Sequence, residues 1–571
     1  MSGLRQPGLG PIIGHTTSTS CRLWIRAGDP GDQDHELSAD RRTLGVIAVL
    51  KIGDQPVNGS LAYFRLHREF DRTGTFNLGV DVTLGKSPDN PDPAKRDTPF
   101  VLQPDQEYCV GLGTLTIDDP FGDDENVSDD TLLGRLPPLA QWMIDELRDE
   151  MPDEAKAIFR TFPASAAPAD QLGFVVGSCR YPGLLWKIKL ADRIFGPIAD
   201  QLVDPQYGPP TRFVLMVGDQ IYADTLNRAI PIGRADTDTE FQERYVTAFS
   251  SLNMRRLLRS VPNYMILDDH EIEDNWTQDR LHTEAKHRLF NLAIGAYMSY
   301  QWSHGPRTWG RRLHCQFECA GYPFFVLDTR TQRTRTQLSN AETDDDLSDN
   351  HLLGRPALHP DEPAQLDQLL AWLTMQQQTR GDVPKFIVSS SVFVPNDMSE
   401  RWGNRPEPED IRRLERSDSW PAYPGTRRAI LDHIVKHRVQ NVVFLSGDIH
   451  CSNLAQMSFS KDGAPLDLKA FSVTSSAFYW PFPFADGNPA DYVHDSRAAG
   501  QEDSFPLSDG TVMDYKSWNF TQEDNYCRLS IDRVAATILV RVYDTDGKQV
   551  SVRTAGGAVR LLEDTLQLAA W

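Results

Sequence analysis

The feature that most constrains the fold is a series of short apolar runs that alternate with segments of helical spacing from about residue 170 onward. The runs have the length of strands buried on both faces, and clear helical patterns fall between them at 282–302 and 363–378. This alternation predicts an α/β fold with a mainly parallel sheet covered by helices. The predicted strands are GFVVGSC at 173–179, RFVLMVGD at 212–219, NYMILDD at 263–269, YPFFVLDTR at 322–330, KFIVSSSVF at 385–393 and NVVFLSGD at 441–448.

The regions on either side of this pattern are rich in β-type runs. From residue 1 to 130, short runs separated by turn residues predict an all-β sandwich, and LQPDQEY at 102–108 has the residue placement of a tyrosine corner. Residues 131–169 are predicted to be a helical linker, because 137–151 has helical spacing. The main domain is then 170–571, and its antiparallel C-terminal strands at 527–555 would complete the sheet system.

The composition limits the classes of partner. The net charge is −22, from 80 acidic against 58 basic residues, which argues against stable binding to nucleic acid or to an anionic membrane. No apolar run is long enough to span a bilayer, and the N-terminal residues lack the features of a secretory signal, so we expect a cytoplasmic protein. Seven cysteines, an odd number in a long chain, do not form a disulfide framework. The sequence does not predict the oligomeric state.

Side chains that can bind metals follow four of the predicted strands. GSC ends in Cys179, GDQIY contains Asp219 and Tyr222, and the motifs DDHEIEDN at 268–275 and GDIH at 447–450 follow two later strands. Because ligand sites in α/β sheets lie at the carboxyl ends of the strands, these segments can converge. Together they offer thiolate, phenolate, carboxylates, an amide oxygen and imidazole, a set that suits a transition metal beside a harder cation. Asp219 taken alone could equally cap the next helix.

The sequence lacks the residues or motifs that several other catalytic mechanisms require. A cysteine phosphatase needs an arginine at a fixed distance after its nucleophilic cysteine, but Leu185 and Met457 stand at that distance after Cys179 and Cys451. The chain has no GxxxxGK[ST] loop for nucleotide phosphates and no GxSxG nucleophile elbow. These observations leave the strand-end cluster as the candidate site.

In their order along the chain, GSC, GDQIY, DDHE and GDIH resemble the motifs of the calcineurin-like metallophosphoesterase superfamily, and in particular its alkaline phosphatase D-like (PhoD-like) family. In that family GSC replaces an Asp-x-His motif, the GD motif is followed by Tyr, DDHE replaces GNH, and the last motif is GDxH. The chain also has similar segments at 159–163 (FRTFP), 327–330 (LDTR) and 418–431 (DSWPAYPGTRRAIL). The resemblance covers about 160 to 530, and the N-terminal region is similar to the family's Ig-like domain only in its β-rich character.

The resemblance implies a four-layer αββα sandwich that brings these motifs to one di- or trinuclear metal site, with an N-terminal all-β domain of the Ig or fibronectin type. By position, Cys179, Asp219 and Tyr222 would hold Fe³⁺ with help from the GDIH motif. Asp219 would bridge to a second metal, Ca²⁺, and other divalent metals such as Mn²⁺ or Zn²⁺ are alternatives.

Other residues would complete this site. The resemblance implies that Asn275, Asp448 and His450 are further metal ligands, with the last two not assigned to a particular metal. Asp269 aligns with the superfamily's metal-binding asparagine and therefore competes with Asn275 for one ligand position. His270 aligns with the histidine that assists the leaving group.

The implied activity is hydrolysis of phosphomonoesters, phosphodiesters or both, in which a metal-activated hydroxide attacks phosphorus in a small-molecule substrate. His270 would protonate the departing alkoxide, and Asp268 or Asp269 would orient its ring. Arg180 and Arg330 follow strands and are candidate phosphate-binding residues. One alternative is a phosphodiesterase or phospholipase D-like enzyme acting on lipid or nucleic-acid phosphates. Another is a catalytically silent binding protein that keeps the scaffold.

Overall fold

The computed structural model describes most of the chain. The described residues are 4–28, 41–57, 60–80, 100–118, 121, 126–141, 151–164, 167–182, 188–224, 233–308, 312–335, 350–354, 363–398, 419–482, 489–553 and 557–571. The fold is mixed α/β, which confirms the predicted class. No helix in these ranges is both long enough and apolar enough to cross a membrane.

The first large sheet has six strands in the order β12-β11-β10-β21-β22-β25. Strands β10, β11 and β12 run parallel, and β21 pairs with β10 in the antiparallel direction. The predicted strands at 173–179, 212–219 and 263–269 and the C-terminal antiparallel strands are therefore confirmed. The bounds are β10 Gln171–Gly177, β11 Thr211–Val217, β12 Asn263–Ile266, β21 Asn525–Asp532, β22 Thr537–Asp544 and β25 Glu563–Gln567.

The second large sheet has eight strands in the order β13-β14-β15-β16-β18-β17-β20-β19. Its central strands β14, β15, β16 and β18 are parallel and include the three other predicted strands. The parallel strands are thus divided between two sheets instead of forming one, because β21 occupies the edge of β10. The bounds are β13 Cys315–Cys319, β14 Tyr322–Val326, β15 Lys385–Ser389, β16 Val442–Ser446, β17 Ser452–Lys461, β18 Ala464–Thr474, β19 Phe505–Pro506 and β20 Thr511–Thr521.

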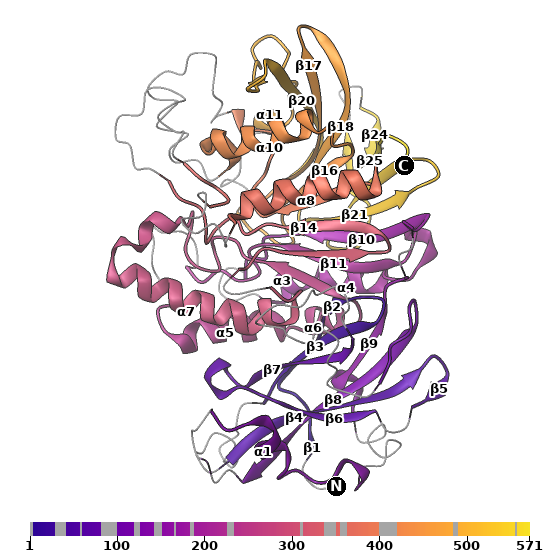
Figure 1. The fold of residues 1–571 in the computed structure, drawn as a ribbon, viewed down its shortest axis with the longest axis vertical. Helices are drawn as coiled ribbons and strands as arrows, with labels where there is room; N and C mark the ends of the chain where they lie inside the picture. The colour runs from indigo at the N-terminus through magenta and orange to yellow at the C-terminus, as the bar shows by residue number, and fades with distance from the viewer. Residues whose placement is uncertain are drawn as a thin grey trace.

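The two large sheets pack face to face, with aromatic side chains between them. Phe174 stacks on Phe213 at 5.0 Å in the first sheet, Phe324 stacks on Phe386 at 4.6 Å in the second, and Phe174 meets Phe324 edge-on at 5.7 Å across the interface. Strand residues alternate between faces, so Val175 points to the opposite core, under the helices. Figure 1 shows helices outside both sheets. Those over the first sheet are α4 Phe195–Asp200, α5 Asp238–Phe249, α6 Leu252–Leu258 and α7 Glu284–Tyr300, and those over the second are α8 Gln365–Arg380 and α10 Pro424–Lys436.

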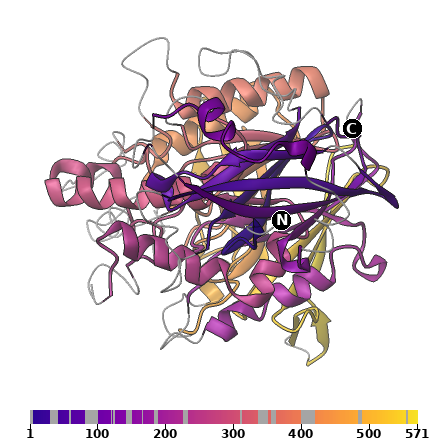
Figure 2. The same cartoon turned by 90° about the horizontal axis from the view of Figure 1, so that it is seen from below.

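The N-terminal region forms two antiparallel sheets with a shared core, which lie at the lower end of the molecule in Figure 1 and face the viewer in Figure 2. The backbone N–H of Gln103 donates to the hydroxyl of Tyr108 at 2.7 Å, which is the contact expected for a tyrosine corner. The larger sheet contains β1 Leu4–Arg5, β4 Arg41–Ile52, β5 Gln55–Pro56, β6 Leu61–Arg65, β8 Glu107–Asp118 and β9 Lys156–Arg160, and the smaller one contains β2 Leu9–Thr16, β3 Ser20–Arg26 and β7 Thr73–Gly79.

The segment predicted to be a helical linker, 131–169, differs from that prediction. It contains strand β9, which pairs with β8 in the antiparallel direction and extends the N-terminal sheet. Alternate burial of Ala157 and Phe159 in the N-terminal core explains the strand. Most of the predicted helix, 142–150, lies outside the described residues.

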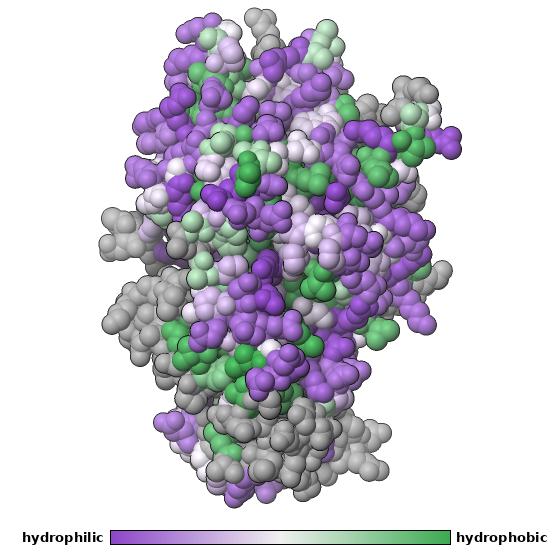
Figure 3. All heavy atoms as spheres, turned by 90° about the vertical axis from the view of Figure 1, so that its right-hand side faces the viewer, coloured by the Kyte–Doolittle hydropathy of each residue, from purple (hydrophilic) through white to green (hydrophobic). Residues whose placement is uncertain are grey.

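The N-terminal sheets and the main domain share an apolar core. Leu9, Ile12 and Trp24 pack among the helices that cover the first sheet, and the indole N–H of Trp24 donates to the carbonyl oxygen of Ser299 in α7 at 2.8 Å. On the face shown in Figure 3, hydrophilic residues predominate and hydrophobic residues lie in small separate groups. Most of the large apolar side chains that the structure describes are buried in the internal cores.

Candidate metal centre

The candidate site lies at the carboxyl ends of parallel strands from both large sheets. Strands β10, β11 and β12 end two residues before Cys179, Asp219 and Asp268, and β16 ends two residues before Asp448. Because parallel strands end at the same edge of a sheet, the loops that follow them meet there. Side chains from these four loops come within 4.8 Å of one another in overlapping groups.

Five of the predicted site residues have a left-handed backbone, namely Cys179, Asp219, Asn275, Asp448 and His450, with φ between 51° and 74°. Such a conformation is uncommon for residues other than glycine and costs of order 1–3 kcal/mol at each position. Backbone strain of this kind is retained mainly at functional sites, where the surrounding structure holds it. Its repeated occurrence in one cluster favours a functional role.

Two glycines allow the loops to approach closely. Gly218 has φ of 90°, and a β-carbon there would lie 2.5 Å from the Cβ of Asp268. A β-carbon at Gly447 would lie 2.4 Å from the hydroxyl oxygen of Ser178. Glycine is therefore required on sterics at the positions before Asp219 and Asp448.

Three groups of potential metal ligands overlap in the site, and the ligand atoms within each group lie within 4.8 Å of one another. They are Cys179 with Asp219 and His450; Asp219 with Asp269 and His270; and Asp219 with Asp268, Asp269 and Asp448. Asp219 belongs to all three groups. Its carboxylate is therefore the donor that the three groups share.

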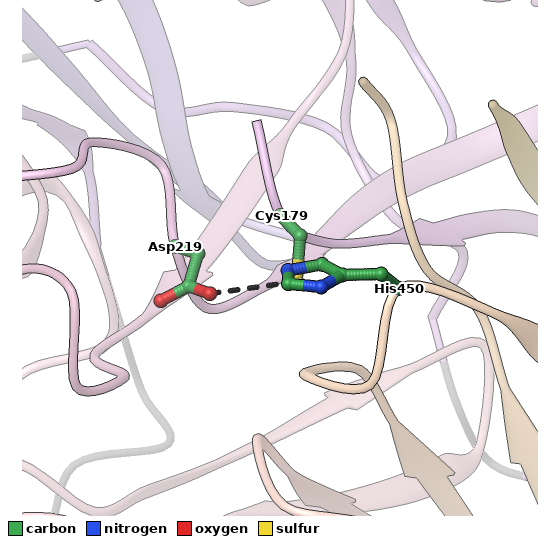
Figure 4. Close-up of side chains that lie close together, drawn as sticks. All are labelled: Cys179, Asp219 and His450. Atoms are coloured by element: carbon green, nitrogen blue, oxygen red, sulfur yellow. Dashed lines mark hydrogen bonds between the residues drawn. The ribbon is translucent and has the colours of Figure 1, made fainter. Parts of the chain in front are cut away.

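The side chains of Cys179, Asp219 and His450 converge from three separate segments, as Figure 4 shows. The sulfur of Cys179 lies 3.5 Å from Oδ2 of Asp219. The hydroxyl of Tyr222 lies 3.3 Å from the same oxygen and 3.3 Å from Nε2 of His450. The structure thus brings together the three side chains for which the resemblance implied a role at iron and His450, which the resemblance did not assign to a particular metal.

The electrostatics of the cluster fit a bound cation. Oδ1 of Asp219 is buried and has no hydrogen-bond partner among the described residues. Burial raises the pKa of Asp219 well above its usual range, and the carboxylates of Asp268 and Asp269 add to the effect of burial while His270 opposes it. A cation would offset both causes by replacing lost hydration and balancing the carboxylate charge.

The thiol of Cys179 and the phenol of Tyr222 also have raised pKa values that a bound cation would offset. Burial, followed by the charge of Asp219, raises the pKa of Cys179 and of Tyr222 well above their usual values. Both groups bind metals as anions, and a cation at hand would lower their pKa. The donor set therefore fits a metal centre.

Asp269 and Asn275, which compete for one ligand position, lie next to each other. The backbone N–H of Asn275 donates to Oδ2 of Asp269, and the side-chain amide of Asn275 donates to Oδ1 of Asp274 at 3.3 Å. Burial alone would raise the pKa of Asp269, but the charges of Arg330 and His270 outweigh it and lower that pKa. Asp269 contributes a carboxylate oxygen to two of the ligand groups, and Asn275 positions that carboxylate.

His270 is oriented by Asp224, and not by Asp268 or Asp269 as the sequence interpretation expected. Oδ1 of Asp224 lies 2.8 Å from Nδ1 of His270. Burial alone would lower the pKa of His270, but Asp224, Asp269 and Asp219 outweigh it and raise that pKa well above its usual value. Asp224 stands in the same GDQIYAD segment as Asp219, five positions later, which is the only signal in the sequence for this contact.

Arg330 supports the carboxylates of the site from within the core. Its guanidinium is 0% exposed, donates to Oδ1 of Asp268, and lies 3.3 Å from Oδ1 of Asp269 and 3.7 Å from Oδ2 of Asp448. Ser390 donates to the same oxygen of Asp268 at 2.6 Å. These contacts identify Arg330 as a partner of buried carboxylates. They do not fit the predicted role, in which the Arg330 side chain is available to bind phosphate.

Arg180 does not fit the predicted role as a phosphate-binding residue. Its guanidinium donates to the carbonyl oxygen of Ala248 at 2.6 Å and to the hydroxyl of Ser251 at 2.9 Å, and it lies over the ring of Phe195. These partners belong to the helices outside the first sheet. The hydrogen bonds of Arg180 therefore join the loop after β10 to those helices.

Glu271 was not identified as a site residue from the sequence, although it is part of DDHE. Its buried carboxylate accepts the backbone N–H groups of Asp219 at 3.2 Å, Gln220 at 2.7 Å and Asp268 at 2.9 Å. It also accepts from the side chain of Gln301 at 3.1 Å. Glu271 thus joins the two loops that carry most of the carboxylates.

Aromatic residues cover the His450 side of the cluster. The ring of His450 stacks on Trp480 with centroids 3.6 Å apart, and Tyr181, Tyr222 and Phe482 pack around this pair. Trp480 and Phe482 lie near the start of the segment 478–495. Its described part borders the cluster, whereas 483–488 lies outside the described residues.

Comparison with known proteins identifies relatives of this chain. Residues 201–489, about half of the chain, match the family model described as PhoD-like phosphatase. A protein named alkaline phosphatase D from Bacillus subtilis (strain 168) is 24% identical over 307 residues, which cover 51% of this chain and 48% of that protein. The chain thus aligns with about half the length of this relative.

A solved structure entitled "Structure of PhoD" is similar over nearly the whole chain. The TM-score is 0.61 at 16% sequence identity, and the match covers 98% of this chain and 90% of that structure. This likeness shows a shared overall fold that includes the N-terminal sheets. Together with the family model, it leads to one assignment: the chain belongs to the PhoD-like phosphatase family.

Proposed function

We propose that this protein is a metal-dependent phosphoesterase of the alkaline phosphatase D type, which hydrolyses phosphomonoesters, phosphodiesters or both. The observation that carries the proposal is the position of Asp219 in all three overlapping groups of metal ligands. Adjacent cation sites that share a carboxylate are a common arrangement in enzymes that hydrolyse phosphate esters. Family membership supports the same reaction class.

We further propose Fe³⁺ and Ca²⁺ as the metals. Cys179, Tyr222 and His450 would hold Fe³⁺ together with Asp219, because phenolate and thiolate donors favour a transition metal. The carboxylates of Asp269 and Asp448, which form a separate group with Asp219 and Asp268, are oxygen donors that suit a harder cation. The family resemblance provides the identity of the two metals.

The roles of the protein groups follow from their contacts. Bound cations would neutralise the phosphate charge and lower the pKa of a water molecule so that it can act as the nucleophile. His270 is held through Nδ1 by Asp224, which leaves Nε2 free to give a proton to the departing alkoxide. Arg330 keeps Asp268 and Asp269 in place, and Trp480 restricts the rotation of His450.

For the fold, we propose that the two face-to-face sheets with their outer helices are the four-layer αββα sandwich of metallophosphoesterases. The interlocked aromatic side chains between the sheets and the separate helical cores on both outer faces support this reading. We also propose an Ig or fibronectin type for the N-terminal sheets, on the basis of the tyrosine-corner contact of Tyr108.

The test is the release of product from p-nitrophenyl phosphate and bis(p-nitrophenyl) phosphate, together with elemental analysis of the purified protein. Asp219→Asn is expected to lower kcat/KM about a thousandfold and to reduce the metal content, because a bridging carboxylate is lost. Asp467→Asn removes one charge from an exposed position and serves as the matched control. The ratio of the two activities separates a monoesterase from a phosphodiesterase. Failure of the metal-loaded protein to hydrolyse either compound would contradict the proposal and favour a binding protein.

A further inference from the structure

A cavity of about 500 Å³ lies between the N-terminal sheets and the second large sheet, and none of the residues that line it belongs to the metal centre. Its walls come from the end of β2 and the turn after it (residues 15, 17 and 18), the segment at 162–163, strand β13 with residues 307, 308, 312 and 314, and one face of helix α8. The volume is within the range of small-molecule sites. Its position between two structural units is also typical of such sites.

Helix α8 presents a polar row to the cavity. The lining residues Gln368, Trp372, Gln376 and Arg380 are spaced four apart and therefore share one face of the helix. The neighbouring residues Leu369 and Leu373 are buried in the core of the second sheet. Glutamines at two turns of a cavity-facing row place hydrogen-bonding groups in the cavity wall.

One of these groups leaves a nitrogen of His314 without a hydrogen-bond partner among the described residues. The amide nitrogen of Gln368 donates to the carbonyl oxygen of Pro363 at 2.9 Å, which turns its Oε1 towards His314 Nε2 at 3.3 Å. Nε2 must then carry the hydrogen, and Nδ1 is an acceptor. Burial lowers the pKa of His314, which is 5% exposed, so the ring is neutral.

Two buried acceptors in the cavity wall lack partners. Nδ1 of His314 and Oε1 of Gln376, whose side chain is also 5% exposed, make no hydrogen bond to any described residue. A buried polar atom without a partner is unfavourable, and most such atoms in proteins are paired with protein, water or a ligand. A ligand with N–H or O–H donors would provide both atoms with a hydrogen-bond partner.

The outer part of the cavity is cationic. Arg307 and Arg312 line it and form no ion pair with a carboxylate in the described ranges, whereas Arg380 is paired with Glu318. This local excess of positive charge occurs in a chain with a net charge of −22. Phe162, Phe317 and Trp372 add apolar surface to the lining of the same cavity.

We propose that this cavity is a second binding site, separate from the metal centre, for a small organic anion with a planar ring that carries N–H donors. The anionic group binds Arg307 and Arg312 through charge-assisted hydrogen bonds. The ring lies against Trp372, and its N–H groups donate to His314 and Gln376. A single molecule that resembles a nucleotide, with a base-like ring and an anionic group, would thus supply the charge, the apolar contact and the N–H donors.

Isothermal titration calorimetry of the full-length, metal-loaded protein with adenosine 5′-carboxylate tests the proposal. This probe has a ring with an exocyclic amino group and an anionic end, but no phosphate ester that the proposed activity could hydrolyse. We expect a Kd below about 1 mM and at least about tenfold weaker binding of uncharged adenosine. No binding of the probe at about 10 mM would overturn the proposal.

Two substitutions distinguish this cavity from the metal centre as the site of binding. Arg312→Gln and Gln376→Leu are each expected to weaken binding about tenfold while leaving phosphoester hydrolysis unchanged. Arg553→Gln removes the same charge from an exposed residue that does not line the cavity, and should bind normally. Circular dichroism and thermal unfolding verify that each variant is folded. Normal binding by both cavity variants would place the probe elsewhere and contradict the inference.

Discussion

Oδ1 of Asp224 lies 2.8 Å from Nδ1 of His270, and the other oxygen of the same carboxylate accepts the backbone N–H of Asp274 at 2.6 Å. Asp224 follows β11 and His270 follows β12, so this contact joins two of the loops that form the metal centre. A carboxylate that is held at both oxygens fixes the orientation of the imidazole ring and its tautomer. Asp224 is therefore a positioning residue for His270.

Replacing Asp224 by alanine should lower kcat about 10- to 100-fold with little change in metal content, because His270 loses its orientation. The loss should be greater for phenyl phosphate than for p-nitrophenyl phosphate, because the poorer leaving group depends more on a proton donor. Steady-state kinetics with the two substrates measure this difference. Asp224→Asn keeps the shape of the side chain and should lose less activity. An equal loss with both substrates would indicate a structural role only.

Tyr222→Phe tests the proposed iron site. Since the phenol oxygen lies 3.3 Å from both Asp219 and His450, a bound Fe³⁺ would have a tyrosinate ligand and a visible charge-transfer absorption. The substitution should abolish this absorption, while Tyr181→Phe should keep it, because the Tyr181 ring packs edge-on against Tyr222 with centroids 5.2 Å apart. The visible spectrum and elemental analysis of each purified protein provide the measurement. Active protein that contains only zinc or manganese would contradict the assignment of iron.

The strands and the ligand-bearing loops could be predicted because the signals for them are local. An apolar run followed by Gly-Asp marks the end of a buried strand, and both runs of this kind, before Asp219 and Asp448, are strands in the structure. The same reasoning predicted that Cys179 and His450 lie together, since parallel strands end on one side of a sheet.

The contacts among the supporting residues could not be predicted in this way. The sequence does not show that Arg330 turns inward to three carboxylates and that Arg180 turns away towards Ala248, because both simply follow strands. Strand β9 was missed because its pairing with β8 is determined by a partner more than forty residues earlier in the chain. Such long-range contacts depend on the three-dimensional fold.

Glu271→Ala should reduce the free energy of unfolding by about 3 kcal/mol or more, because it leaves three buried backbone N–H groups without an acceptor. Glu271→Gln should cost less, since its carbonyl oxygen still accepts. Urea unfolding of the two variants measures the difference. Glu523→Ala at an exposed position should change the value by less than about 0.5 kcal/mol. A similar small change for Glu271→Ala would show that the loops do not depend on this carboxylate.

His304 should make the stability of the protein dependent on pH. Burial, assisted by the charge of Arg22, lowers the pKa of this histidine to about 3 at the contact between α7 and the N-terminal sheets. Between about pH 3 and about pH 6.5, His304 binds a proton in the unfolded chain but not in the folded protein. The free energy of unfolding therefore falls as the pH falls, by about 1.4 kcal/mol per pH unit. His304→Gln should reduce this slope when urea unfolding is compared at about pH 7 and about pH 5. The exposed His282, replaced in the same way, should leave it unchanged.

Gly218→Ala separates backbone strain from steric conflict in the metal centre. The residue has φ of 90°, and the added β-carbon would lie 2.5 Å from the Cβ of Asp268. Gly463 also has a positive φ, 76°, but an added β-carbon there meets nothing within 4 Å. Gly463→Ala should therefore cost only about 1 kcal/mol of strain, with normal metal content and activity. Gly218→Ala carries similar strain and must also push Asp268 away from Arg330, so it should lose metal and most of its activity. Equal behaviour of the two variants, in urea unfolding and elemental analysis, would show that the close approach of the two loops is not needed to form the site.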